Sequence, residues 1–246
     1  MKIFICEDSP VGFFTAVFDA YLHKAKPNLI TSANTFQPSF TTEVITIPPD
    51  KEKAERVKRK IIALTGFTSE INAIETVLLS NSALKETVCF NYINLIIEKG
   101  GRVDKMLAEI SVIEFNDLKH KVLNKVHRFK GFLRFIETEN GVLYAHYEPD
   151  NNITALLAPH FKERIKIIPF IIHDIKRNIL ALYNGKDIKV IYCDKPLAIY
   201  YSKQEKEMQE LWKGYFDSVN IESRKNTKQQ DNYLPRRYRK HMNEFI

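Results

Sequence analysis

The period at which apolar residues recur changes near residue 127, and this change limits the folds open to the chain. Before it, apolar side chains mostly return every three or four residues, as on one face of a helix. After it, apolar and polar residues alternate in short runs, as in strands with one buried face. A chain of 246 residues divided in this way is expected to form two lobes of different architecture.

The first half is expected to be mostly helical, with short strands at residues 3–6 and 43–47. Ser9 followed by Pro10 predicts the start of the first helix, because serine caps helix N-termini and proline fits the first helical position. This helix is expected to end before Pro27. Further helices are predicted after Asp50 and at about 69–80, 82–99 and 114–127.

The second half is expected to be built on a sheet. Residues 128–138 and 141–147 are predicted to pair as a hairpin, because Asn140-Gly141 is typical of a tight turn. More strands are predicted at 167–172, 179–183 and 188–192, and helices at 153–164 and after Ser202.

These patterns together indicate a mixed α+β protein. A helical N-terminal lobe with two short strands is expected over residues 1–112. The C-terminal lobe over 113–220 is expected to hold an antiparallel sheet flanked by helices. The tail over 221–246 is basic, and we expect it to be partly mobile and to dock through its aromatic residues.

Positive charge is concentrated in the second half of the chain. Residues 1–110 carry 13 basic and 13 acidic side chains, so the whole net charge of +7 lies after residue 110. The stretch 115–135 has six basic residues against one acidic residue, and the stretch 221–246 has seven against three. This distribution predicts a polyanionic partner for the second half, and a solvated basic surface is the alternative interpretation.

The candidate nucleic-acid-binding residues are the cations and aromatics of these two basic stretches. On the predicted strand at 128–138, alternation places Arg128, Lys130, Phe132 and Arg134 on one face, where they could follow phosphates and stack one base. The remaining candidates are Lys125, Arg236, Arg237, Tyr238 and Lys240. An exposed strand face with no ligand is the alternative.

The candidate catalytic residues lie between residues 148 and 177. His160 and Arg164 are four residues apart on a predicted helix and should share a face, while His173 and Asp174 stand at the end of an apolar strand. A histidine near a carboxylate can act as a general base, and an arginine beside them can hold a phosphate. The alternative is that these groups only form ion pairs and caps within the fold.

The sequence predicts no cofactor and no metal site. It contains no glycine-rich phosphate loop and no dinucleotide-binding fingerprint, and the spacing of His160 and His173 matches no standard zinc motif. The three cysteines, Cys6, Cys89 and Cys193, lie far apart, which is typical of a protein of the reducing cytoplasm. No apolar run is long enough to span a membrane, and no membrane partner is expected.

Long stretches of the chain resemble a bacterial family of DNA repair or DNA metabolism proteins whose C-terminal domain has no known function. The resemblance covers nearly the whole chain and rests on ICEDSPVGFFTAVFDAY, HRFKGFLRF, YAHYEPDNNITALLAPHF, PFIIHD and LPRRYRKHMNEF. Phe170 stands where the family usually has tryptophan, and Arg239 where it usually has an aromatic residue. The resemblance implies DNA as a partner and cooperation with a radical-SAM protein, and it supplies no catalytic residues.

Three functions therefore remain open from the sequence. The first is a DNA-binding accessory or repair protein that uses the basic surface of the second half and works with a partner enzyme. The second is an enzyme acting on nucleic acid or nucleotides through the histidine, arginine and aspartate residues named above. The third is an adaptor whose basic surface binds an acidic protein.

Overall fold

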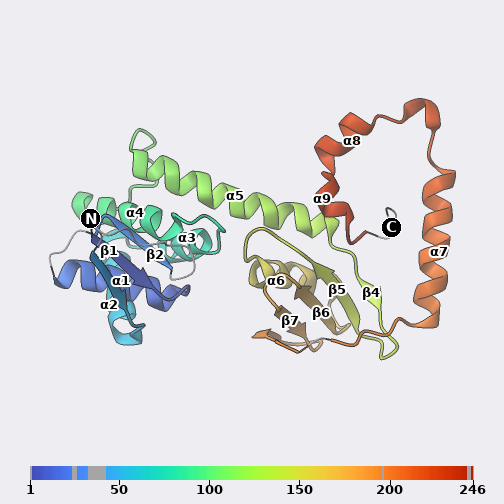
Figure 1. Cartoon of the computed structure of the whole chain (residues 1–246), viewed down its shortest axis with the longest axis horizontal. Helices are drawn as coiled ribbons and strands as arrows, with labels where there is room; N and C mark the ends of the chain where they lie inside the picture. The colour runs from blue at the N-terminus through green and yellow to red at the C-terminus, as the bar shows by residue number, and fades with distance from the viewer. Residues whose placement is uncertain (1, 24–26, 33–42, 196, 243–244, 246) are drawn as a thin grey trace. The chain divides into compact units, whose positions relative to one another are not determined.

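A computed structural model describes the chain except for residues 1, 24–26, 33–42, 196, 243–244 and 246 (Figure 1). The chain divides into two compact units, Met1–Asn124 (unit 1) and Lys125–Ile246 (unit 2). The predicted lobe boundary at residue 112 and this division both fall within one helix, α5 (Ile110–Phe132). The mixed α+β class expected from the sequence is confirmed.

Unit 1 is built on a small parallel sheet. The strands β1 (Lys2–Cys6), β2 (Leu29–Ser32) and β3 (Glu43–Ile47) pair in the order β2-β1-β3. The sequence predicted β1 and β3 but not β2, because the four residues Leu-Ile-Thr-Ser show too little alternation to mark a strand. The central position of β1 explains why Ile3 and Phe4 are fully or almost fully buried.

The predicted helices of unit 1 are confirmed. They are α1 (Pro10–Leu22), α2 (Lys51–Thr65), α3 (Ser69–Leu78) and α4 (Lys85–Lys99). The Ser9 hydroxyl accepts from Gly12 N at 3.0 Å, and Asp50 Oδ1 accepts from Glu52 N at 2.9 Å, so both predicted starts carry side-chain caps. Gly100 ends α4 with φ 66°, a left-handed conformation that glycine adopts without steric cost.

Unit 2 is built on a mixed sheet. The strands β4 (Ile136–Glu137), β5 (Leu143–Tyr147), β6 (Phe170–Asp174), β7 (Ile179–Tyr183) and β8 (Ile188–Tyr192) follow one another in that order. β5 and β6 run parallel and the other neighbours antiparallel, so the expectation of an antiparallel sheet was wrong at this pair. The helix α6 (Thr154–Ile165) forms the crossover that a parallel pair requires, and it packs on β6, β7 and β8 (Figure 1).

The prediction of a strand from residue 128 was also wrong, since α5 continues through Phe132. Phe129 and Leu133 are buried, and a spacing of four residues satisfies both a strand face and one helical turn. The buried Val122 and Val126 extend the same stripe backwards with helical spacing. Only the short β4 remains of the first hairpin strand, and it pairs with β5 across the predicted Asn140-Gly141 turn.

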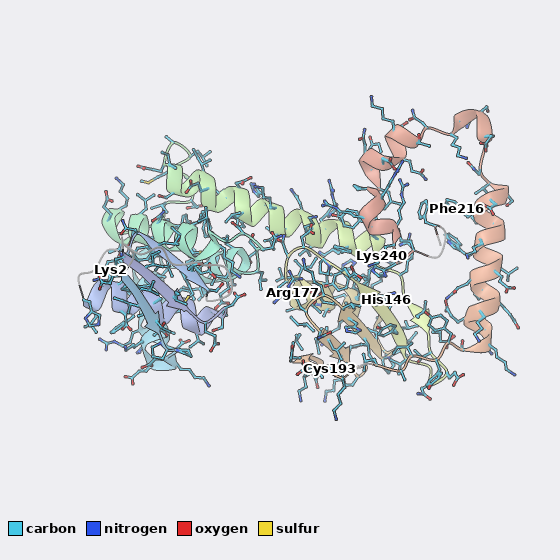
Figure 2. All side chains as sticks on the ribbon, viewed as in Figure 1. Lys2, His146, Arg177, Cys193, Phe216 and Lys240 are labelled. Carbon is cyan, nitrogen blue, oxygen red and sulfur yellow. The ribbon has the colours of Figure 1, made fainter. Side chains whose placement is uncertain are left out.

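The C-terminal part of unit 2 is helical. It comprises α7 (Lys203–Ser218), a 3-10 turn at Glu222–Arg224, α8 (Thr227–Tyr233) and α9 (Arg236–Arg239), and the tail residues 243–244 and 246 lie outside the described part of the chain. No residue of α7 is buried. Near its start, Glu205 Oε2 accepts from Glu137 N at 2.9 Å, and near its end Phe216 (Figure 2) packs on Phe245.

Candidate nucleic-acid interface and histidine cluster

Three of the predicted nucleic-acid-binding residues, Lys125, Phe132 and Tyr238, hold the C-terminal segment in place. Tyr238 is only 6% exposed, and its ring lies 5.1 Å from Phe129 and 5.2 Å from Phe132. Lys125 Nζ donates to the Tyr238 hydroxyl at 3.1 Å and pairs with Asp150 Oδ2 at 2.6 Å. Burial alone would raise the pKa of Tyr238, but the hydrogen bonds and charges of Lys125, Arg128 and Arg237 together lower that pKa. The buried face of Tyr238 is not available to stack a base.

The other tail candidates are exposed cations with acidic partners. Arg236 pairs with Asp231 at 3.2 Å, and Arg237 lies 3.5 Å from Asp150. Lys240 Nζ lies 2.6 Å from Glu148 Oε1, and this contact lowers the pKa of the Glu148 carboxyl. The pairs of Arg237 and Lys240 tie the tail to the loop after β5, the pair of Arg236 lies within the tail, and all three compensate part of its charge.

A second group of cations gathers where α5 ends beside α6. The half-buried Lys130 and the exposed Arg164 are both close enough to His160 to lower the pKa of its imidazole, after partial burial as the largest cause. His160 and Arg164 thus lie together, as their helical spacing predicted. Arg128 is also exposed, but it lies beside Tyr238, on the side of the helix that faces the tail.

Beside these cations lies a groove of about 590 Å³. We call it the basic groove, and its lining includes Arg134, Phe135, Phe161, Arg164, Met208 and Trp212. The residues come from the end of α5, the segment after it, α6 and α7, all within unit 2. Glu205 also lines the groove, and its two oxygens accept from Glu137 N and from the Gln209 amide. The arrangement combines fixed positive charge with exposed aromatic surface.

The third feature is a cluster of imidazoles on the sheet. In the parallel register His146 on β5 lies beside His173 on β6, and the Tyr144 hydroxyl is 2.8 Å from His173 Nδ1. The His241 ring from the terminal segment meets His146 edge to face at 4.6 Å, and Lys240 and His146 lie near each other in Figure 2. We call Tyr144, His146, His173, His241 and Glu148 the histidine cluster.

The predicted catalytic residues do not form one site. His173 and Asp174 point to opposite faces of β6, because side chains alternate along a strand. Asp174 is fully buried and paired with Arg177, whereas His173 contacts Tyr144. No contact among the described residues joins the pair His160 and Arg164 on α6 to His173 or Asp174.

Sequence reasoning missed Tyr144, His146, His241 and Glu148. The alternation of Tyr144 and His146 was a usable signal, since it places both on one face of a strand. Their meeting with His173 depends on a parallel register that no local pattern reveals. Among the described residues, no group of histidine, cysteine and acidic side chains is arranged to hold a metal ion.

A known protein family matches most of the chain. Residues 83–244 match a family described as a domain of unknown function, DUF4130. The chain belongs to the DUF4130 family. The matched region contains the basic groove and the histidine cluster entirely, so both are features of the DUF4130 domain in this chain. The comparison with curated proteins finds no match. None of the helices in the described part of the chain is long and apolar enough to cross a bilayer.

The histidine cluster predicts that the DUF4130 domain loses stability in mild acid. Burial is the largest cause that lowers the pKa of His146, His173 and His241. In the unfolded chain these imidazoles return to a pKa of about 6.5 and bind protons more readily than in the folded domain. Stability is therefore retained above about pH 6.5 and falls as the pH drops below it, by at most about 1.4 kcal/mol per pH unit for each imidazole.

This expectation is checked by urea unfolding at pH 7.5, 6.5 and 5.5. The matched variant His146→Gln/His173→Gln should show a shallower dependence, because two of the three titrating groups are gone. His120→Gln is a control, since this exposed histidine lies on α5 outside the cluster. A wild-type free energy of unfolding that stays constant from pH 7.5 to 5.5 would show that the pKa values of these imidazoles do not differ between the folded and unfolded states.

Proposed function

We propose that this protein acts in DNA repair or DNA metabolism by binding DNA through the basic groove of unit 2. The observation that carries the proposal is the gathering of Lys130, His160 and Arg164 beside a groove whose lining adds Arg134 and exposed aromatic surface. Cations held next to one another repel each other. A bound phosphate reduces this repulsion, so the group of cations attracts phosphates. The resemblance noted above extends the proposal to joint action with a radical-SAM protein.

The electrostatics of His160 support this location. Lys130 and Arg164 both lower the pKa of the imidazole, so the site is already positive before any histidine titrates. A bound phosphate would reverse this influence and favour the protonated ring. One acidic side chain, Glu205, also lines the groove, where its oxygens accept from Glu137 N and the Gln209 amide. The two arginines of the lining, Arg134 and Arg164, outnumber it, so the lining keeps a positive balance.

The tail contributes less to the proposed interface than its composition indicated. Arg237 and Lys240 face Asp150 and Glu148, and Arg236 faces Asp231. A phosphate would have to displace these carboxylates. Nothing in the groove resembles a helix that inserts into the major groove to read base edges, so we expect binding that depends weakly on DNA sequence and strongly on salt.

Charge reversal of the cations in and beside the groove tests the proposal. Each phosphate contact contributes about 0.7–0.9 to the slope of log affinity against log salt, so Lys130→Glu/Arg134→Glu/Arg164→Glu should flatten the slope by about two to three units. Affinity is measured by fluorescence anisotropy of a labelled oligonucleotide between low and moderate salt. Circular dichroism verifies that the variant is folded.

The matched control is Lys186→Glu/Lys189→Glu/Lys195→Glu, which changes the net charge equally at exposed positions outside the groove. Its slope should remain close to that of the wild type. Equal losses in the two triple variants would mean that net charge alone drives retention, and the groove would not be the site. A wild-type protein that binds neither single-stranded nor duplex DNA at low salt would end the proposal.

A further inference from the structure

We infer that the basic groove takes unpaired nucleotides, with one base stacked on the indole of Trp212. The inference rests on the proposed function and names the form of DNA that the groove accepts. It follows from the exposed ring of Trp212, from the lower exposure of Phe135 and Phe161 and from the charge around the groove.

Trp212 has the most exposed side chain among the aromatic residues that line the groove. Its side chain is 46% exposed although it lies on the apolar side of α7, and the Tyr215 ring lies 5.7 Å away. Phe161 is 2% exposed and packs edge to face on Phe135 at 5.0 Å. Phe161 thus belongs to the core, and the partly buried Phe135 packs on both Phe161 and Phe170, so Trp212 is the most exposed aromatic side chain of the lining.

The size and chemistry of the groove suit a nucleotide. A volume of about 590 Å³ is within the range of small-molecule sites, about 300–1,000 Å³. Arg134 and Arg164 line the groove that Trp212 also lines, so one nucleotide can meet a ring face and a cation together. Indole stacking accepts any base, since every base has a π-face, and the arginines follow the backbone.

A duplex cannot make this contact. Inside a duplex both faces of each internal base are covered by the neighbouring base pairs, and a protein reaches only the base edges in the grooves. A base becomes available for stacking in a single strand, at a frayed end or when it is turned out of the helix. The exposed indole therefore favours single-stranded DNA over duplex of the same length.

The apolar side of α7 is also compatible with a helical peptide or a second copy of the chain, because Met208, Leu211 and Trp212 are all exposed. The flanking charge decides against these occupants. Arg134 and Arg164 line the groove and Lys130 lies near them beside His160, and such a group of cations favours a polyanion over an apolar helix face. We therefore assign the groove to single-stranded DNA. Binding of a helical peptide or of a second copy of the chain is an alternative that the experiment can detect.

Trp212 is the single tryptophan of the chain, so intrinsic tryptophan fluorescence reports on the groove alone. We would titrate the full-length protein with a short oligothymidylate, with a duplex of the same length and with inorganic polyphosphate. The single strand should quench the emission in a salt-dependent manner. Polyphosphate should bind the same cations without quenching, because it carries no base, and the duplex should quench much less than the single strand.

Substitution then measures the contribution of the indole. Trp212→Ala should weaken binding of the labelled oligothymidylate roughly 5- to 150-fold, the usual range for one stacked base, whereas Trp212→Phe should retain part of the affinity. The control is Tyr233→Ala, which removes an exposed aromatic residue outside the groove. Because Trp212 is not buried, both groove variants should keep the wild-type melting temperature.

The outcomes separate the inference from the proposed function. Salt-dependent DNA binding with no quenching and no effect of Trp212→Ala would overturn the inference and leave the DNA-binding proposal standing. Equal quenching by duplex and single strand would also overturn it. Emission that changes with protein concentration alone, together with a dimer in sedimentation, would mean that a second copy occupies the groove. Absence of any DNA binding would end both proposals.

Discussion

Replacing Arg177 with alanine is expected to lower the free energy of unfolding of unit 2 by about 3–5 kcal/mol. The Asp174 side chain is fully buried, and Arg177 Nη1 lies 2.9 Å from its Oδ2. Burial raises the pKa of the Asp174 carboxyl, and the guanidinium opposes that rise. Without Arg177 the protein must keep an unpaired carboxylate in its interior or protonate it, and both states cost free energy.

Arg177 also anchors the loop that follows β5. Its Nη1 donates to Pro149 O at 2.9 Å, and its Nη2 donates to the carbonyl of Asp150. The loop carries Glu148 and Asp150, which pair with Lys240 and Arg237 of the tail. Loss of Arg177 should therefore loosen the terminal segment as well, visible as faster amide exchange around Tyr238.

The matched control is Arg164→Ala. Arg164 is exposed on α6, and its removal should change stability by no more than about 0.5 kcal/mol. Both variants are compared by urea unfolding. An Arg177→Ala protein within about 1 kcal/mol of the wild type would contradict a structural role for the pair and would restore Asp174 as a candidate for chemistry.

The elements of unit 1 could be predicted largely because their signals are local. Ser9, Asp50 and Gly100 lie at helix ends and act within a few residues, so the helices that they bound are recognisable without tertiary information. The strand β2 was missed because its four residues owe their conformation to pairing with β1. The sequence of the segment alone does not predict this pairing.

Unit 2 shows why a correct pattern can give a wrong element. Phe129 and Leu133 fit both a strand face and a helical stripe, and the decision for helix comes from Val122 and Val126 earlier on the same helix. The consequence for the site is direct. Lys130 and Arg134 no longer share a face with Arg128 and instead join His160 and Arg164, which the sequence had placed in a separate group.

The histidine cluster was beyond sequence reasoning for a different reason. His146 and His173 are 27 residues apart and become neighbours only through the crossover of α6 and the parallel register of β5 and β6. His241 belongs to the C-terminal segment, and the buried side chains of Tyr238 and Met242 hold it beside His146. Contacts of this kind are properties of the topology, so the sequence could supply the residue types but not their partners.

The second large effect is expected in the core of unit 1. Phe14 on α1 is fully buried, its ring centroid lies 5.3 Å from that of Phe13, and Lys58 Nζ lies 5.3 Å from the Phe14 ring. Phe14→Ala removes a ring from a site where α1 and α2 pack closely, and the backbone can close only part of the cavity. The expected loss is about 3–5 kcal/mol of the free energy of unfolding of unit 1.

Phe18→Ala, one turn further along the same helix, provides the comparison. Phe18 is only partly buried, with the Arg56 guanidinium 5.0 Å from its ring, and it lines an open apolar groove of about 560 Å³. Its loss removes less buried surface and leaves no closed cavity, so the cost should be about 1–2 kcal/mol. Calorimetry of the two variants shows which substitution lowers the melting temperature more. Equal destabilisation would mean that α1 packs through both rings alike, and a Phe14→Ala protein with the wild-type melting temperature would show that this stripe is not the core of unit 1.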